Sequence, residues 1–536
     1  SEIPTVSHSI ADIARMNPQI TTNGQSGAMS FAGTNNRYNA FQIDGAMNND
    51  MFGLTSNGSN GGLAGAQPVS METVEQIQIN VAPFDVRQSG FTGGAINAIT
   101  KSGTNEFHGS AYLYGNNEKL VGRHYKLPGG KYADPYSDES ESMFGFTLGG
   151  PILKNKLFFF VNFERSYKSY PNEYGLGSPD SKVDAEKATD ILAAIKDIAQ
   201  RQGVNYNGQY DSSDSDTWSN KAGFKIDWNI NDFNKFMVRW SYVNASSLNG
   251  RGGITTLNTI DHLYRLKSNT NTVTAELQSR LSPVLSNEAR LSYVGVRDKR
   301  TSVAAFPSIT IKNVGNGTVN IGNEYSSMAN GLDQDVWTLE DNLTFGTHNE
   351  LYSFDNLFIQ NLYGSYNFLS ADDFFSYYNG VLDGTGMYTD SKGHLSPIGT
   401  LINSYNFGRA NTAVTGDPRW SSAFSAGQIG FYAQDKWDVN RNLQLTYGMR
   451  FDIPLFFDTP TENAPFNEWA ATNGYDLKTN RKLASKLMVS PRLGFRWDIA
   501  GDKRYILRGG AGIFTGRIPF VWLSNNFTNT GVQMES

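Results

Sequence analysis

The chain has 536 residues, of which 13% are aromatic and 54 are glycine, and it contains no cysteine. The lack of cysteine excludes disulfides and thiolate metal sites, and a net charge of −6 without a basic stripe argues against nucleic acid as a partner. The mean hydropathy is −0.42, and apolar runs such as Leu157 to Val161 fall far short of the roughly 18 consecutive apolar residues of a transmembrane helix.

A β-barrel escapes this length requirement, because only alternate residues of each strand face lipid. At the N-terminus, residues 4–18 are predicted to form an amphipathic turn or helix, and a strand is predicted to end at the turn Asp44-Gly45. Stretches rich in Asn and Gly follow at 47–53 and 56–62. Residues 71–114 alternate apolar and polar side chains, turn at glycines and end in an aromatic stretch typical of a strand.

From residue 107 onward, alternating segments of about ten residues recur, which is the length with which a tilted strand crosses a bilayer. In Phe224 to Trp228 and in Phe431 to Trp437 one face is aromatic and the other polar. This pattern favours a wall that faces lipid, although a half-buried soluble sheet has the same period of two. We predict strands at 107–117, 142–149, 157–168, 217–229, 234–246, 268–281, 286–299, 335–346, 349–362, 425–438, 442–452, 490–500 and 503–514.

The connections between these strands alternate strictly between short and long. The short connections are 150–155, 229–234, 282–286, 346–349, 440–442 and 501–502. The long connections are 118–141, 169–216, 247–267, 300–334, 363–424 and 453–489. Short turns on one side and long loops on the other are typical of an outer-membrane barrel, with the long loops outside the cell.

The number of predicted strands is odd, whereas bacterial single-chain barrels have even numbers. The residues from Gly516 onward are expected in an external loop after an ascending strand. An open barrel would expose unpaired backbone groups to lipid. We therefore expect the chain to be part of a longer protein, with further strands and a segment before residue 1.

Two features of the long loops suggest roles of their own. Residues 182–200 are predicted to form a helix with an apolar face, as a lid in the second external loop or as a docking site for a surface lipoprotein. The acidic run 211–216 is expected to be a solvated loop, with Ca²⁺ as the alternative, because it lacks the glycine and distal glutamate of an EF-hand. The six histidines have no ligand spacing, and we expect no metal site, cofactor or catalytic residue.

Several motifs resemble those of the TonB-dependent receptors of bacterial outer membranes. Glu75 to Ile79 and Gly93 to Lys101 are similar to the segment that leads from the plug of these receptors into the first barrel strand, and residues 31–45 are similar to a plug motif that ends in Asp-Gly. Broad barrel motifs match at 432–437, 445–452 and 490–495. The motifs at 35–39, 84–86, 91–97 and 513–522 look like the Oar-like branch of Bacteroidetes and myxobacteria.

The resemblance implies an all-β membrane protein of the outer membrane, with a small α+β plug domain in the lumen of a large antiparallel barrel. The full protein is then expected to have about 22 strands. Residues 1–103 would form the plug, without its N-terminal part, and residues 104–536 the N-terminal portion of the barrel with long extracellular loops. The TonB box and the small N-terminal β-domain of such receptors do not occur in this sequence, so energy coupling is expected from the resemblance alone.

The function implied is active import of a large solute, such as a peptide, a glycan or a metal chelate, driven through TonB at the periplasmic face. The long polar and aromatic loops favour a peptide or a glycan. Two other functions stay open, namely a passive plugged channel or export conduit, and a surface adhesin or structural outer-membrane protein.

The resemblance also assigns residues to roles. Contact with the ligand is expected at the plug apices, from Asn48, Asn49, Asp50, Phe52, Phe84 and Gln88. Ala32 stands where many receptors have arginine, so the charge pairs that lock the plug to the barrel are depleted. We expect Arg37, Glu72 and Glu75 to take over this locking role.

Overall fold

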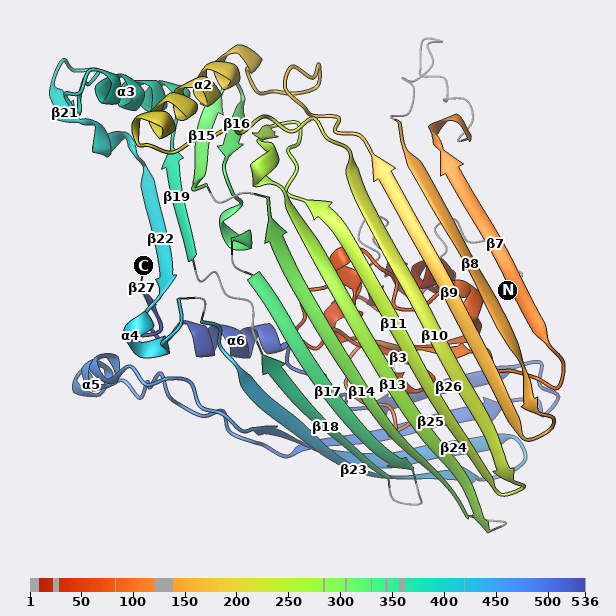
Figure 1. The fold of residues 1–536 in the computed structure, drawn as a ribbon. Coiled ribbons are helices and arrows are strands. Elements are labelled where there is room, and N and C mark those ends of the chain that lie inside the picture. The colour runs from red at the N-terminus through yellow and green to blue at the C-terminus, as the bar shows by residue number, and fades with distance from the viewer. Residues whose placement is uncertain are drawn as a thin grey trace.

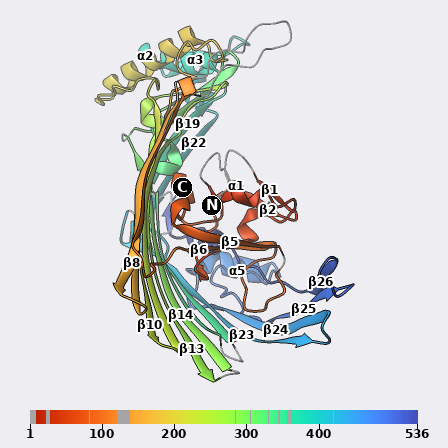
Figure 2. The same cartoon turned by 90° about the vertical axis from the view of Figure 1, so that its right-hand side faces the viewer.

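The computed structural model describes residues 9–22, 28–81, 83–120, 138–282, 285–303, 306–328, 330–342, 346–355, 362–418 and 420–535. In this part of the chain a large curved sheet wraps around a small N-terminal domain and carries a cap of helices and strands at its upper end (Figures 1 and 2). None of the described helices is long and apolar enough to cross a membrane.

The large sheet, which we call the wall, has 13 antiparallel strands in chain order. They are β7 (His108–Asn117), β8 (Ser140–Leu153), β9 (Leu157–Tyr170), β10 (Ser215–Asn231), β11 (Asn234–Asn249), β13 (Tyr264–Ser282), β14 (Leu285–Ser302), β17 (Asn330–Asn342), β18 (Gly346–Asp355), β23 (Phe424–Asp438), β24 (Leu443–Phe456), β25 (Met488–Asp498) and β26 (Ile506–Gly512). Each predicted strand has a counterpart in the wall, although residues 356–361 of the strand predicted at 349–362 lie outside the described residues. Several, such as β13 with 19 residues, are longer than predicted because their ladders continue at the cap end.

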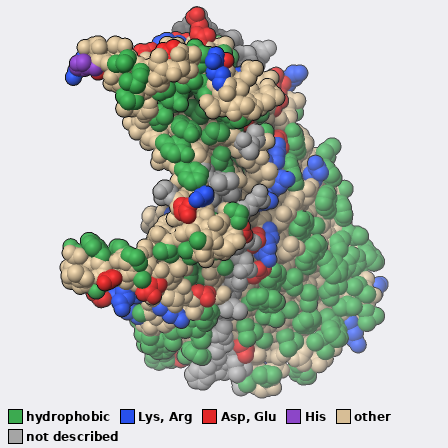
Figure 3. Space-filling model, turned by 60° about the vertical axis from the view of Figure 1, so that its left-hand side comes forward, with side chains coloured by type: hydrophobic (Ala, Val, Ile, Leu, Met, Phe, Trp, Pro, Cys, Tyr) green, Lys and Arg blue, Asp and Glu red, His purple; other side chains and the backbone are tan. Residues whose placement is uncertain are grey.

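The two faces of the wall differ in chemistry because successive side chains of a strand point to opposite sides. On the outer face Val273, Leu277 and Leu291 are 38–46% exposed, whereas Thr274 and Ser292 on the inner face are buried. Figure 3 shows hydrophobic side chains gathered over the lower part of the outer face, below the cap. An apolar outer face and a polar inner face are what a wall that faces lipid requires.

The N-terminal domain, residues 9–103, lies against the inner face of the wall (Figure 2). Its elements are α1 (Ile10–Ala14), a hairpin of β1 (Ile20–Thr22) and β2 (Met29–Phe31), and a sheet in the order β4 (Ala46–Met47), β3 (Ala40–Ile43), β6 (Gly94–Thr100) and β5 (Val74–Val81). Residues 4–8 of the turn or helix predicted at 4–18 lie outside the described residues, and α1 forms within the remainder. The predicted turn is present, because Asp44 and Gly45 both adopt positive φ between β3 and β4.

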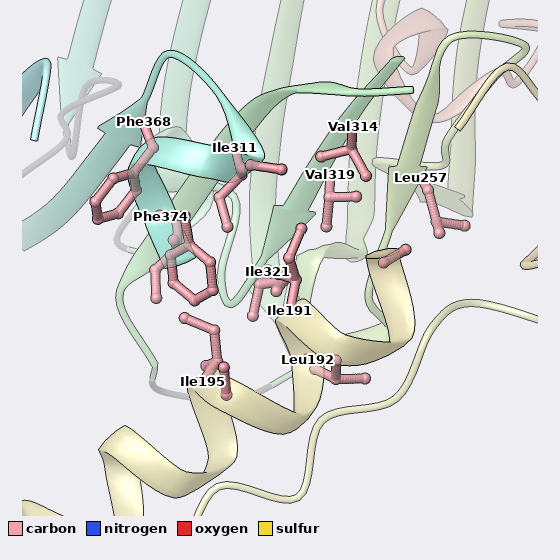
Figure 4. Packing of buried hydrophobic residues seen from close by; sticks show 14 of the residues in the cluster. Ile191, Leu192, Ile195, Leu257, Ile311, Val314, Val319, Ile321, Phe368 and Phe374 are labelled. Atoms are coloured by element: carbon pink, nitrogen blue, oxygen red, sulfur yellow. The ribbon is translucent and has the colours of Figure 1, made fainter. Parts of the chain in front are cut away.

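The cap has a sheet of its own, in the order β12 (Thr256–Asn258), β16 (Gly317–Ile321), β15 (Ser308–Val314), β19 (Leu362–Phe368), β22 (Ser404–Ala410) and β27 (Met534–Glu535). The helices α2 (Ala185–Arg201) and α3 (Ala371–Leu382) pack on it. Figure 4 shows how Ile191 and Ile195 of α2 meet Ile311 and Ile321 of the sheet, all of them buried. The helix predicted at 182–200 is therefore confirmed. The sequence suggested loops without regular structure in the long connections, but these connections contain strands and helices. The difference arises because strands as short as β15 and β16 form only against this shared core.

Further short elements complete the outer end of the chain. They are the hairpin β20 (Met387–Thr389) and β21 (Leu395–Pro397), and the helices α4 (Thr412–Thr415), α5 (Ala464–Thr472) and α6 (Phe520–Thr528). One-turn 3-10 helices lie at Asn36–Tyr38, Gly62–Ala64, Met71–Thr73, Glu118–Leu120, Ile260–His262, Tyr325–Ser327 and Ile398–Leu401. The residues after Gly516 lie at the outer end of the wall, as the sequence suggested, where Phe527 stacks on Phe424 with 5.0 Å between ring centroids.

A histidine in the cap gives it a pH dependence that can be measured. Burial lowers the pKa of His262 below its usual 6.5 and outweighs the carbonyl of Gly322, which accepts a hydrogen bond from Nδ1 at 3.0 Å, and the charges of Glu324 and Asp261. Below pH 6.5 the unfolded cap therefore binds more protons than the folded cap. We expect the cap to have its full stability above pH 6.5 and to lose stability as the pH falls below it.

Limited proteolysis of the cap on intact cells between pH 7.5 and pH 5, a range around the pKa values of histidine, would measure this loss. The variant His262→Gln keeps a neutral donor for Gly322 and is expected to flatten the pH dependence. An equally steep dependence in that variant would contradict the assignment to His262.

Candidate functional site

The candidate site is the interface between the N-terminal domain and the inner face of the wall, because any passage along the wall has to cross it. A buried ion pair across this interface joins Arg239 of β11 to Asp44 of the β3–β4 turn, with 3.2 Å between Nε and Oδ2 and both side chains below 10% exposure. The carboxylate also accepts hydrogen bonds from the backbone N–H and the hydroxyl of Thr100. Arg239 donates in addition to the carbonyl of Ile43 at 3.2 Å.

A second arginine of the wall lies directly beneath the same turn. Arg290 pairs with Glu276, Glu288 and Glu340 of the wall at 2.6–2.9 Å. It also reaches the carbonyl of Gly45 at 3.4 Å. Gly45 has a φ of +74°, and a Cβ at this position would overlap the guanidinium, so glycine is required there for both conformation and space.

On the opposite side, the start of β5 is held by a buried carboxylate. Glu164 of β9 forms an ion pair with Lys221 of β10, with 2.6 Å between Oε1 and Nζ. Its other oxygen accepts hydrogen bonds from the hydroxyls of Ser70 and Tyr112. Ser70 belongs to the N-terminal domain, so this network ties the domain to three strands of the wall.

The loop of residues 83–91, which we call the seam loop, is held through its backbone. Arg492 of β25 donates to the carbonyls of Asp85 at 2.6 Å and Gln88 at 2.8 Å. Arg450 of β24 donates to the carbonyl of Val86 at 3.2 Å, and the side-chain oxygen of Gln434 accepts from the N–H of Val86 at 2.9 Å. Main-chain contacts of this kind hold the loop whatever its side chains are.

Asp85 is the acidic residue of the seam loop. Burial raises the pKa of its carboxyl, but hydrogen bonds from Arg87 together with the charges of Arg87 and Arg492 outweigh burial and hold the pKa below its usual value. The carboxylate stays ionised and bound to Arg87, with 2.6 Å between Oδ2 and Nη2. It therefore neutralises Arg87, which projects from the same loop.

One cavity adjoins this interface, and a second lies at the outer end of the wall. The first, of about 490 Å³, lies between the N-terminal domain and the wall near the short turns and is lined by amides such as Gln78 and Asn97 and by charged residues such as Lys235 and Glu288. The second, of about 580 Å³, lies at the outer ends of β23 and β24 beside α6. Its lining combines phenylalanines, asparagine amides and three basic residues, namely Phe424, Phe456, Phe466, Phe527, Asn525, Asn526, Asn529, Lys478, Arg481 and Lys482.

Most residues predicted to contact ligand serve the internal structure of residues 47–62, which we call the apical loop. Asn48 and Asn49 are at most 9% exposed. The Asn48 side chain accepts from Asn60 at 2.9 Å, and the Asn49 amide bonds the backbone of Phe41 and Asn39 at 2.8 and 2.7 Å. The hydrogen-bonding groups of these two amides are therefore already used within the N-terminal domain.

Asp50 and Phe52 are occupied as well. The Asp50 carboxylate accepts hydrogen bonds from the backbone N–H groups of Phe52, Leu54 and Thr55. Phe52 has no exposed surface and packs in a cluster with residues of the wall and of α6. In this structure the turn itself uses the side chains of Asn48, Asn49, Asp50 and Phe52, and ligand contact by these four residues stays a prediction.

The two seam-loop residues of the prediction are placed differently. Phe84 lies over Gly494 of β25 and 6.1 Å from Phe514, so it anchors the loop to the wall. Gln88 lines the cavity of 490 Å³, and its buried Oε1 has no hydrogen-bond partner among the described residues. Ligand contact by Phe84 and Gln88 stays a prediction.

The predicted locking residues are not the ones that lock the domain. Within the described residues Arg37 and Glu75 are exposed and have no ion-pair partner, and Glu72 reaches the wall only through Tyr114 at 3.5 Å. The lock is reversed, because the arginines stand on the wall and the carboxylate and carbonyls on the N-terminal domain. The wall arginines are Arg239, Arg290, Arg450 and Arg492.

The acidic run 211–216 is folded into the base of the cap. Asp211 is 1% exposed and accepts from Ser213 and Asn172, and Asp216 pairs with Arg265 at 2.6 Å. Calcium in this loop stays a prediction. Within the described part of the chain no group of three or more acidic, histidine or cysteine side chains is arranged to hold a metal ion, and His124 lies outside that part.

Comparison with known families gives a match over most of the chain. The family described as "Outer membrane beta barrel domain" matches residues 99–181 and 174–535. The TonB-dependent transporter Oar of Myxococcus xanthus is 33% identical over 164 residues, which are 30% of this chain and 14% of that protein. The probable TonB-dependent siderophore receptor PirA of Acinetobacter baumannii is 27% identical over 150 residues, which are 28% of this chain and 17% of that protein.

Solved structures resemble the whole chain. The outer membrane transporter YddB from Escherichia coli has a TM-score of 0.61 at 14% identity and covers 100% of this chain. The ferric enterobactin receptor PfeA from Pseudomonas aeruginosa has a TM-score of 0.56 at 15% identity and covers 98%. In both cases the chain spans 62% of the solved protein, and the likeness concerns the fold.

Proposed function

The chain belongs to the family of outer-membrane β-barrel domains, and from this premise we propose that it is part of a TonB-dependent transporter that imports a large solute across the bacterial outer membrane. In this proposal residues 1–103 are the plug and the remainder is the wall of the barrel. The solute is bound from outside and released into the periplasm. Transport requires that the plug moves or partly unfolds.

The observation that carries this proposal is the set of buried charged contacts between the N-terminal domain and the wall. Removing one partner of a buried ion pair costs about 3–5 kcal/mol, and Asp44–Arg239 is such a pair. Spontaneous opening is therefore rare. A seal of this strength favours a transporter on which work is done over a passive channel, and an adhesin would need no seal at all.

The mechanism follows from these contacts. Ligand binding at the outer face has to stabilise a second arrangement of the plug, since a ligand shifts an equilibrium only by its differential affinity for the two states. TonB then pulls on the plug from the periplasm and transmits the energy of the inner-membrane proton gradient. Polar contacts can be replaced by water one after another as the interface opens. The apolar cluster around Phe52 is expected to separate in one step.

The class of solute is proposed from the loops and from the relatives. The outer cavity of about 580 Å³ offers aromatic faces, amides and basic groups, which suit a peptide or a glycan. Two of the compared proteins are named as receptors for siderophores or ferric enterobactin. A metal chelate is therefore the second class of solute under this proposal.

Uptake by whole cells tests the proposal. Cells with and without the intact gene receive a fluorescent casein digest, a labelled glycan mixture or an iron chelate, and accumulation and surface binding are measured separately. We expect accumulation of one probe to require both the receptor and TonB, and to stop when a protonophore collapses the proton gradient. Accumulation that persists without TonB would indicate a passive channel, and binding without accumulation would indicate an adhesin.

A further inference from the structure

Arg492 is a buried cation that is held by backbone carbonyls. Its side chain is 4% exposed, and no carboxylate of the described residues forms an ion pair with it. Its Nη1 donates to the carbonyls of Pro83, Asp85 and Gln88 at 3.4, 2.6 and 2.8 Å, and its buried Nε has no hydrogen-bond partner among the described residues. All three carbonyls belong to the seam loop.

The other arginines of the interface are neutralised. Arg450 pairs with Asp452 at 2.8 Å, Arg239 with Asp44 at 3.2 Å, and Arg290 with three glutamates. Arg492 contacts the faces of Phe91 and Phe514, at 5.4 and 4.8 Å from their centroids, in addition to its carbonyls. The charges of Asp85 and Asp452 act on it from nearby, but neither carboxylate forms an ion pair with it in the described part of the chain. Of the four arginines, Arg492 is therefore the one without an ion-pair partner among the described residues.

A carboxylate is a better partner for a guanidinium than a backbone carbonyl. It carries a full charge and accepts two parallel hydrogen bonds from the planar guanidinium, whereas a carbonyl offers a dipole. A buried charge that lacks a counter-ion is unfavourable. An anion that reached Arg492 would thus replace the carbonyls, and the seam loop would lose the contacts through which β25 holds it.

Two arginines lie on the outer side of the seam loop. A small recess of about 20 Å³ is lined by Arg37, Asp50, Gly90, Arg517 and Pro519. The guanidinium of Arg517 lies directly against Gly90 in the seam loop, and Arg37 is exposed. The recess holds no more than about one water molecule, so an organic anion can pass only if the loop moves.

We propose that Arg492 is an anion-operated latch: a carboxylate group of the incoming solute takes the guanidinium from the carbonyls of residues 83–88 and so breaks the hydrogen bonds that join the seam loop to β25. The inference rests on the proposed transport function and adds the chemical class of the solute, which carries at least one carboxylate. Loss of these hydrogen bonds opens a path between the seam loop and β25. Arg37 and Arg517 attract the anion before it reaches Arg492.

These 536 residues contain no native cysteine, and any cysteine in the rest of the receptor is replaced by serine for the test. In the full-length receptor in outer-membrane vesicles, Ser89→Cys places a thiol at a site of 4% exposure within the seam loop, and Ser59→Cys places one at 3% exposure elsewhere in the N-terminal domain. The rate of maleimide modification is measured at constant pH in sodium citrate and in sodium chloride of equal ionic strength. We expect citrate to accelerate modification of the Ser89→Cys thiol several-fold and to leave the Ser59→Cys thiol unchanged.

The same measurement is repeated with Arg492→Gln and with the matched control Arg496→Gln, each in the Ser89→Cys background. Arg496 lies on the same strand and the same face, and it has no hydrogen-bond or ion-pair partner among the described residues. We expect the citrate effect to vanish with Arg492→Gln and to persist with Arg496→Gln. The proposal is overturned if citrate and chloride give equal rates for the Ser89→Cys thiol, if both thiols respond alike, or if Arg492→Gln still responds.

The comparison of the two thiols needs no change at Arg492. Equal rates in citrate and chloride would therefore overturn the proposal even if Arg492→Gln fails to reach the membrane. The vesicles contain no proton gradient, and loop release is read without transport. Failure of TonB-dependent uptake with a citrate response intact would reject the transport proposal and leave the latch standing as an anion site. A missing citrate response in cells that show TonB-dependent uptake would reject the latch alone.

Discussion

Replacing Arg239 by alanine is expected to make the outer membrane permeable to large hydrophilic molecules that the intact protein excludes. The substitution leaves the Asp44 carboxylate at 7% exposure without its cation, and the carbonyl of Ile43 without a donor. Removing one partner of a buried pair costs about 3–5 kcal/mol, because the remaining charge is desolvated and uncompensated. The β3–β4 turn then leaves the wall to hydrate Asp44, and the seal between turn and wall is lost.

Influx of a hydrophilic antibiotic too large for porins measures this effect in cells. The double variant Asp44→Asn with Arg239→Met removes both charges, and Asn tolerates the positive φ of residue 44, so most of the seal should return. Arg265→Ala is the matched control, because its pair with Asp216 is 32% and 21% exposed and lies at the outer end of the wall. Such a pair contributes at most about 1 kcal/mol. Equal permeability of all three variants would show that the pair does not hold the seal.

The strands of the wall could be predicted from the sequence because few backbone structures can cross a membrane. Every backbone group of a spanning strand has to be paired, and its side chains have to alternate between lipid and lumen, so each strand carries its own signal. The match to the TonB-dependent transporter Oar also confirms the family resemblance seen in the motifs. The cap strands carry no such signal. β12 has three residues and β16 has five, and they are strands only because α2 and α3 cover the sheet they form.

The lock between the domain and the wall was harder to predict. Arg239 and Ile43 are 196 positions apart, and only the register of the wall brings them together. Arg450 and Asp452 offered a better signal, since residues two apart on a strand share a face and both were polar at inward positions. Their partner, the backbone of Val86, has no sequence signature. A search for charges on the inner face of predicted strands would have found the arginines but not what they bind.

The apical loop shows how the same residue types support two interpretations. Asparagine and aspartate side chains suit ligand contact, but they also bond nearby backbone groups and so build turns. In residues 47–55, the side chains of Asn49 and Asp50 bond backbone groups and so build the turn. The burial of Phe52 follows from α6, which comes more than 450 positions later in the chain and so lay outside any local pattern.

The second large effect is therefore expected at Phe52 itself. The substitution Phe52→Ala removes a ring with no exposed surface from the cluster that joins the apical loop to Val294 and Leu332 of the wall and to Leu523 of α6. Loss of a buried phenylalanine costs about 3–5 kcal/mol when the cavity cannot collapse. The loop keeps its internal hydrogen bonds through Asp50, so it should detach as a folded unit rather than unravel.

Proteolysis and thiol labelling can separate these outcomes. We expect the apical loop of Phe52→Ala to become sensitive to added protease in intact cells, while Ser59→Cys inside the loop stays unreactive because that thiol is buried by the loop itself. Phe107→Ala, which removes a ring of 67% exposure from the end of the wall, is the matched control and should change neither readout. Simultaneous exposure of both sites would mean that the loop depends on Phe52 for its own fold. Then ligand binding could not move the loop as a unit, and the opening of the plug would have to begin at the polar contacts of Arg239 and Arg492.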